Sequence, residues 1–174
     1  MKSSASLVLL LLLAANVSAQ EKPERYADSA VGFSFAVPQG WAVSDVPSEK
    51  FKVVHGPRLN GFTPNIATVD DEFEGALKDY MALSQRHLEA SYKRLGYDSV
   101  KLLRQAEFTT REGLVGVKLT NEVKTFGKEL VFAQYAFGGK GNAKLIFTCV
   151  SLAADFAVIE PVCEASMKTL TIAK

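Results

Sequence analysis

Histidine and cysteine are scarce in this 174-residue chain, which has two residues of each. Structural zinc sites usually take four cysteine or histidine ligands, so we expect no bound metal, and no other cofactor signature is present. Cys149 and Cys163 are not spaced as C-x-x-C, which argues against a thioredoxin-like redox site. We expect the histidines, His55 and His87, to have structural or surface roles.

Catalytic signatures are also missing. The sequence has no G-x-S-x-G turn around a nucleophilic serine and no glycine-rich phosphate-binding motif. The glycine cluster Gly138-Gly139-Lys140-Gly141 precedes a predicted strand rather than a helix, so it is predicted to be a turn. We therefore expect that the protein is not an enzyme.

Neither charge nor hydrophobicity is concentrated in the body of the chain. The 20 basic and 19 acidic residues are well mixed, without the basic block that nucleic-acid binding requires. The only long apolar run, residues 7–15, is too short to span a bilayer. Lys2 precedes this run and Val17-Ser18-Ala19 follows it, which is the layout of a secretory signal peptide cleaved between Ala19 and Gln20.

These patterns predict an exported protein, periplasmic or secreted, with one domain. We expect residues 1–19 to be the signal peptide, 20–25 a flexible lead-in and 26–174 the domain. A lipid-anchored protein would need a cysteine at the new N-terminus, whereas the first cysteine is Cys149. We therefore expect no stable membrane anchor, no nucleic-acid partner and a monomer.

The body of the chain has the alternation of an antiparallel β-protein. Short strands are predicted at 33–37, 51–55 and 66–69, with a Gly- and Pro-rich loop at 56–65. Four longer strands are predicted to form a meander, at 100–110, 114–123, 129–137 and 144–152, with 129–137 central because both of its faces are apolar. In the first of these, Val100, Leu102, Ala106 and Phe108 are predicted to share one face.

Two helices are predicted. Apolar residues at spacings of three and four predict a helix over 72–95, with Asp71 as its N-cap and Gly96 just beyond its end. A second helix is predicted between Asp155 and Lys168, interrupted after Val158 so that Pro161 falls in a new first turn. Residues 170–173 are predicted to close the fold as an edge strand. The fold class is therefore α+β, an antiparallel sheet between helices.

The stretch Gly32-Phe33-Ser34-Phe35-Ala36-Val37-Pro38-Gln39-Gly40-Trp41 resembles the PsbP-like fold family. Residues 62–69 and the order and length of the later elements match the same pattern. Members include the extrinsic PsbP subunit of photosystem II and DcrB-like bacterial envelope proteins. The resemblance implies an α/β/α sandwich and a non-catalytic, partner-binding role, and it supplies no catalytic residues.

The two cysteines leave two alternatives. An even cysteine count in an exported protein favours a Cys149–Cys163 disulfide, which requires the strand that carries Cys149 to pack against the last helix. Two buried free thiols are the other alternative.

Three sets of residues are candidates for binding. The acidic residues at 70–72 and 74 are interpreted as helix-capping rather than as a calcium site. In the 56–65 loop, Arg58, Leu59 and Phe62 form the predicted partner-binding surface, although Phe62 also suits packing over the sheet edge. His55 and His87 lack a third ligand in the sequence pattern.

Three functions follow from these observations. The first is an exported accessory protein that binds a partner protein. The second is a carrier of a small apolar ligand in a cavity between sheet and helix, and the third is an unrecognised hydrolase. An unfilled cavity would favour the second, and a cleft with a nucleophile next to a histidine would favour the third.

Overall fold

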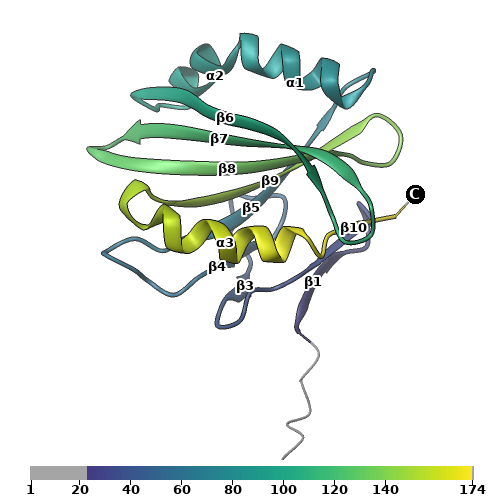
Figure 1. Ribbon diagram of the computed structural model, residues 1–174, viewed down its shortest axis with the longest axis horizontal. Helices are drawn as coiled ribbons and strands as arrows, with labels where there is room; N and C mark the ends of the chain where they lie inside the picture. Colours follow the sequence, from purple (N-terminus) through teal and green to yellow (C-terminus); the bar gives the residue numbers. More distant parts are fainter. Residues whose placement is uncertain (1–22, 174) are drawn as a thin grey trace, which may run out of the picture.

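The computed structural model describes residues 23–173 as a layered α+β fold, which confirms the predicted class (Figure 1). A seven-stranded antiparallel sheet forms the middle layer, in the order β3-β4-β5-β9-β8-β7-β6. Its strands are β3 (Ala42–Ser44), β4 (Val53–His55), β5 (Asn65–Glu72), β6 (Ser99–Thr109), β7 (Val115–Thr125), β8 (Lys128–Gly138) and β9 (Ala143–Leu152). The expected signal peptide and its cleavage site at Ala19 and Gln20 lie outside the described residues.

The meander β6-β7-β8-β9 is confirmed, with β8 between β7 and β9. The β7–β8 connection is tight because Phe126 and Gly127 both have positive φ angles, of 46° and 71°, a pair of values typical of the hairpin turns that suit the twist of antiparallel strands. On the other edge of the meander, β9 pairs with β5 along the whole length of β5.

A second, three-stranded sheet has the order β1-β2-β10, with β1 (Arg25–Asp28), β2 (Phe33–Ala36) and β10 (Thr171–Ile172). The predicted strand at 33–37 and the closing edge strand are thus confirmed, but they belong to this small sheet. Arg25, in the expected lead-in, is the first residue of β1. The small sheet packs on the large one through aromatic residues, since the ring centroids of Phe33 and Phe147 are 5.2 Å apart.

Helices cover the two faces of the large sheet (Figure 1). On one face lie α1 (Leu77–Arg86) and α2 (Leu88–Arg94), and on the other lie α3 (Phe156–Met167) and the small sheet. The Cys149–Cys163 disulfide is confirmed: it joins β9 to α3, with a Cα–Cα distance of 6.3 Å. None of the helices within residues 23–173 combines the length and apolar character needed to cross a bilayer.

The prediction of one helix over 72–95 is wrong at its start and its middle. Asp71 does not cap a helix, because β5 continues through Glu72 and pairs with β9. Gly75 then has a φ of +139°, a conformation that residues with a Cβ rarely adopt, so the helix begins only after it. A second break at His87 divides α1 from α2, while Gly96 does follow the end of α2 with a φ of +86°.

Two further predictions are corrected. The helix α3 is continuous from Phe156, with Pro161 in its interior; Ala157 and Pro161 are both exposed, so the carbonyl that the proline leaves unpaired faces water. In β6, a register shift between Leu102 and Arg104 moves the later residues to the opposite face. Val100 therefore packs below α2 and Phe108 below α3, and they do not share a face.

The α3 side holds one continuous core. It contains the aromatic residues of β2, β8 and β9 together with Ile159, Cys163 and Met167 of α3. The buried Lys118 ammonium lies under α3 and donates to Glu160 and Glu164 at 2.7 and 2.6 Å. The buried Lys118 ammonium is therefore paired with two carboxylates, and such pairing is the condition for tolerating a buried charge.

Candidate functional site

The α1–α2 side of the sheet is packed differently, in two separate apolar clusters. Met81 of α1 sits on Leu119, Ala136 and Ile146. Leu88 and Tyr92 of α2 pack against a second cluster formed by Val100, Val123, Leu130 and Phe132. A pocket of about 270 Å³ lies where the two clusters are separated.

The sheet supplies a partly polar floor for this pocket because of the strand register. Leu119 pairs with Gln134, and Gln134 pairs with Thr148. Since alternate residues of a strand share a face, Asn121 also lies on this side, two residues after Leu119. These amides interrupt an otherwise apolar surface, so closing the helices tightly over them would bury polar groups at a cost.

A hydrogen-bonded chain connects the floor residues. Asn121 Nδ2 donates to Gln134 Oε1 at 2.9 Å, and Gln134 Nε2 donates to Thr148 Oγ1 at 3.4 Å. The Asn121 side chain is fully buried, with 0% of its surface exposed. Its Oδ1 atom finds no hydrogen-bond partner among residues 23–173.

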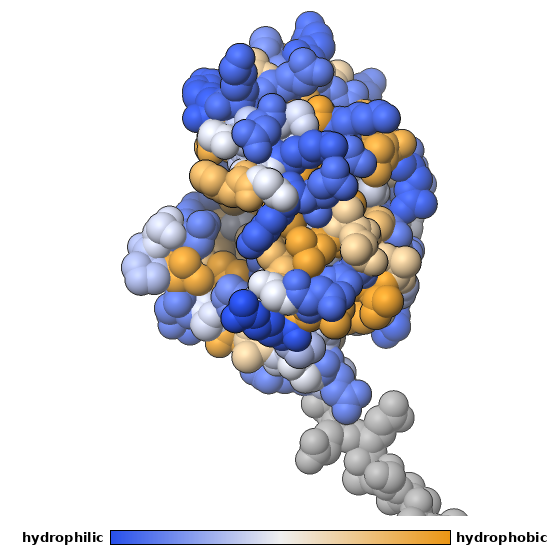
Figure 2. Space-filling model, turned by 90° about the vertical axis from the view of Figure 1, so that its left-hand side faces the viewer, coloured by the Kyte–Doolittle hydropathy of each residue, from blue (hydrophilic) through white to orange (hydrophobic). Residues whose placement is uncertain are grey.

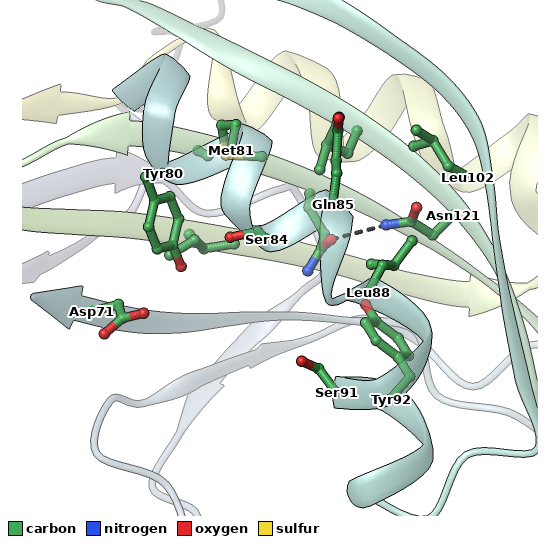
Figure 3. Close-up of a pocket in the computed structure, with 14 residues that line it drawn as sticks. Asp71, Tyr80, Met81, Ser84, Gln85, Leu88, Ser91, Tyr92, Leu102 and Asn121 are labelled. Atoms are coloured by element: carbon green, nitrogen blue, oxygen red, sulfur yellow. Dashed lines mark hydrogen bonds between the residues drawn. The ribbon is translucent and has the colours of Figure 1, made fainter. Parts of the chain in front are cut away.

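The helices and the β5 strand supply the walls. Tyr80, Ser84 and Gln85 come from α1, and Leu88, Ser91 and Tyr92 from α2 (Figure 3). Leu102 stands beside Asn121, with which it pairs across the strands, and Asp71 lies at the opposite end of the site (Figure 3). The pocket therefore has an acidic end, an apolar middle and an amide at its inner end.

The tyrosines of the pocket are uncharged at neutral pH. Burial raises the pKa of Tyr92 to about 12. Burial, followed by the negative charge of Asp71, also raises the pKa of Tyr80. The exposed Asp71 is the one carboxylate among the described lining residues, which include no lysine, arginine or histidine.

The outer surface of the helical layer differs from its inner surface. The top of the molecule is largely hydrophilic in the view of Figure 2, whereas hydrophobic surface gathers below it. The charged residues of α1 face water, and its inner face supplies Met81 and the pocket wall. The amphipathic pattern of the sequence therefore correctly predicted which side of α1 faces the sheet.

The loop at 56–65 is a hairpin whose tip is held in place by a side-chain hydrogen bond. Leu59 and Phe62 exchange backbone hydrogen bonds, and Asn60 and Gly61 turn the chain with positive φ angles of 48° and 80°. The Asn60 amide donates to Asp155 at 2.7 Å, which fixes the turn to the 3₁₀ turn Ala153–Asp155 between β9 and α3. Arg58 is exposed and donates to the Gly61 carbonyl.

The two apolar residues of this loop are half-buried. Leu59 packs on the core below α3, and Phe62 packs on the cluster around Phe132. Packing of Phe62 against the sheet is the alternative that the sequence pattern offered for this residue. Partner binding by Arg58, Leu59 and Phe62 stays a prediction, with Arg58 the most accessible of the three.

The histidines and acidic residues considered as metal ligands lie apart from one another. His55 ends β4, and His87 is exposed at the junction of α1 and α2. Asp70 pairs with Lys50, while Asp71 faces the pocket. Within the described part of the chain, no group of three potential ligands lies close enough to hold a metal ion.

The pocket residues Asn121 and Gln134 were missed at the sequence level. The available signal was a single polar residue on an apolar strand face, since Val117, Leu119 and Val123 flank Asn121 at alternate positions. Gln134 likewise interrupts a strand that is apolar on both sides. Only the register shows that these two amides are neighbours.

Comparison with known proteins gives structural relatives only. No protein-family model matches the sequence, and no curated protein matches it significantly. Among solved structures, cyanobacterial PsbP (CyanoP) from Synechocystis is similar with a TM-score of 0.66 and 14% identity, over 86% of this chain and 92% of that one.

Two other structures share the fold. LpqN from Mycobacterium tuberculosis, described as involved in cell envelope biogenesis, has a TM-score of 0.61 and 11% identity over 90% of this chain and 88% of that one. The Ran-binding protein Mog1p of Saccharomyces cerevisiae has a TM-score of 0.56 and 11% identity over 87% of this chain and 95% of that one. The architecture, the strand order and these likenesses together show that this chain has the PsbP-like fold.

Proposed function

We propose that this chain is an exported, non-catalytic accessory protein that binds a small ligand in the pocket between the sheet and α1–α2. The observation that carries the proposal is the fully buried Asn121 at the pocket floor, whose Oδ1 atom has no partner within residues 23–173. Buried polar groups are normally hydrogen-bonded, and an orphaned acceptor in a pocket is a place where a ligand gains energy.

Binding is favoured over catalysis by the chemistry of the lining. Ser84 and Ser91 face the site, but the lining residues described include no histidine that could activate them. One of the structures that share the fold, Mog1p, is described as a Ran-binding protein, which supports a binding role at the level of the fold.

Export is supported by three observations of different kinds. The expected signal peptide precedes the domain, and the Cys149–Cys163 disulfide is typical of oxidising compartments. LpqN, which shares the fold, is described as acting in cell envelope biogenesis. We therefore propose that the protein acts in the periplasm or outside the cell.

A protein partner at the 56–65 hairpin is the second candidate function. The observation in its favour is the rigid tip, because the Asn60–Asp155 hydrogen bond orders the loop before any partner arrives. The half-burial of Leu59 and Phe62 limits the apolar area that the hairpin offers.

The test is native mass spectrometry of the protein isolated from its own host. We expect a fraction of the molecules to carry a small molecule that denaturation releases. A Ser84→Leu variant, in which the new side chain occupies the pocket, should come out without it, while an Ala82→Leu variant on the exposed side of α1 should retain it. Equal occupancy in both variants would contradict the proposed site.

A further inference from the structure

The direction of the hydrogen-bonded chain decides what the pocket floor offers to a ligand. Thr148 Oγ1 accepts from Gln134, and Gln134 Oε1 accepts from Asn121. Asn121 therefore uses its amide nitrogen on the protein, and its oxygen, which is closed to solvent, has no hydrogen-bond partner among residues 23–173. Figure 3 shows the nitrogen directed along this bond and the oxygen turned away from it. A bare amide oxygen accepts hydrogen bonds and donates none.

The charges around the pocket also favour a ligand that donates hydrogen bonds over an anionic ligand. Asp71 lies at one end of the site, and no lysine, arginine or histidine is among the residues that line it. Lys144 is the residue opposite Asp71 in the β5–β9 register, but its ammonium donates to the carbonyl oxygens of Phe73 and Asn142 at 2.8 Å each. The hydroxyl groups of Tyr80, Ser84, Ser91 and Tyr92 can donate or accept along the walls. At the Asn121 oxygen the site offers an acceptor alone, and the described lining residues include no cation that would stabilise an anion.

The size and the apolar walls limit the rest of the ligand. A volume of about 270 Å³ is below the usual range for drug-sized molecules. Leu88, Tyr92 and Leu102 supply aliphatic and aromatic surface beside the amide. A single ring or a chain of a few carbons with one polar end matches these dimensions.

We propose that this pocket selects small amphiphiles whose polar end donates a hydrogen bond to Asn121 Oδ1, namely alcohols or amines, and discriminates against carboxylates. This inference rests on the proposed ligand-binding function and adds the chemical class of the ligand. A carboxylate would bring a second acceptor against the Asn121 oxygen and a negative charge towards Asp71. A ketone fits the volume but cannot donate.

The experiment compares four ligands that share a six-carbon skeleton. Binding of 1-hexanol, hexylamine, hexanoate and 2-hexanone to the oxidised, mature protein is measured by NMR titration at neutral pH, where hexanoate is ionised. We expect 1-hexanol or hexylamine to bind about tenfold more tightly than 2-hexanone, the effect of one neutral hydrogen bond. Hexanoate should be weaker again, because its charge loses hydration without gaining a cation.

The alcohol and amine arms distinguish the two donor types. Tighter binding of hexylamine indicates that Asp71 contributes, and an Asp71→Asn variant should then remove the advantage of the amine. Tighter binding of 1-hexanol indicates that a neutral donor suffices. Both results support the inference.

A pair of variants on neighbouring residues supplies the control. Asn121→Leu removes the acceptor and should weaken 1-hexanol binding about tenfold while leaving 2-hexanone unchanged. Thr120→Val is matched to it: Thr120 is also buried, with 4% of its surface exposed, and its hydroxyl also lacks a partner within residues 23–173, but it faces the opposite side of the sheet. This variant should bind 1-hexanol as the wild type does.

The outcomes separate the inference from the proposed function. Hexanoate or 2-hexanone binding as tightly as 1-hexanol overturns the donor preference but leaves a ligand-binding pocket. If none of the four ligands binds and the native protein carries no small molecule, the proposed function fails, and the inference fails with it. The wild-type series decides the question even if Asn121→Leu does not fold.

Discussion

Filling the pocket should stabilise the protein while abolishing its binding. Ser84 is half-buried on α1 and faces the space above Asn121 and Gln134. A leucine there adds three net apolar carbon groups in place of a hydroxyl. Full burial of each carbon contributes about 0.8 kcal/mol, and leucine is also the better helix former. Because the site is only half-buried, we expect a gain of about 1 to 2 kcal/mol in the free energy of unfolding.

The assay pairs a stability measurement with a binding measurement. Urea denaturation gives the free energy of unfolding of the wild type, of Ser84→Leu and of the control Ala82→Leu. The control adds the same side chain to the exposed face of α1, where a surface change should stay within about 0.5 kcal/mol. A stabilised variant that has lost 1-hexanol binding identifies a space kept open at the expense of stability.

Two results would refute this reasoning. If Ser84→Leu is destabilised by more than about 1 kcal/mol, the space is already filled and the new side chain is overpacked. If the variant is stabilised but binds 1-hexanol as the wild type does, the ligand occupies another part of the molecule.

Three further predictions concern the rest of the fold. Reducing the Cys149–Cys163 disulfide, which closes a loop of 14 residues in sequence separation, should lower the free energy of unfolding by about 3 kcal/mol in the chain-entropy model; equal urea midpoints with and without reductant would contradict this. Phe62→Ala should cost about 2 kcal/mol because Phe62 packs half-buried on the cluster around Phe132, whereas Arg58→Ala should change the unfolding free energy by less than about 0.5 kcal/mol; similar denaturation curves for the two variants would show that the hairpin does not pack as described. Burial, full for Tyr26 and Tyr135 and partial for Tyr80 and Tyr92, raises the pKa values of these four tyrosines. Their neutral forms therefore stabilise the fold below pH 10, and this contribution is lost as the pH rises from 10 through the value of about 12 for Tyr92. Tyrosinate absorbance should therefore rise together with loss of tertiary structure above pH 10, and ionisation of most tyrosines near pH 10 in a folded protein would contradict it.

The meander and the fold class could be predicted from the sequence because each strand is bounded by local turn signals. Gly127 and the glycines around Lys140 mark the connections, and the alternation of apolar residues marks the faces. The disulfide was the favoured of two alternatives, because Cys149 falls on a predicted strand and Cys163 on a predicted helix that could pack on it. These features depend on residues that are near one another in the sequence.

The errors arose where pairing between distant segments decided the structure. Asp71 has the right spacing to cap a helix, but pairing of β5 with β9 holds it in a strand. The face that Phe108 presents depends on the register shift after Leu102, which no local pattern in β6 announces. Tertiary pairing overrides local preference in both cases.

The candidate site could not be predicted for the same reason. Asn121, Gln134 and Leu88 come from β7, β8 and α2, and they become neighbours only through strand register and the position of the helix over the sheet. A ligand-binding cavity between sheet and helix was among the functions that the sequence left open. The residues that line it became known only from the structure.

The most direct measurement of the central claim is the NMR shift map of the isotope-labelled protein with saturating 1-hexanol. Ligand binding in the pocket predicts that the largest changes fall on the side-chain amides of Asn121 and Gln134 and on Leu102 and Ser84. It also predicts no change at the 56–65 hairpin. Shifts confined to the hairpin, or scattered over the surface with the Asn121 amide unaffected, would contradict the account.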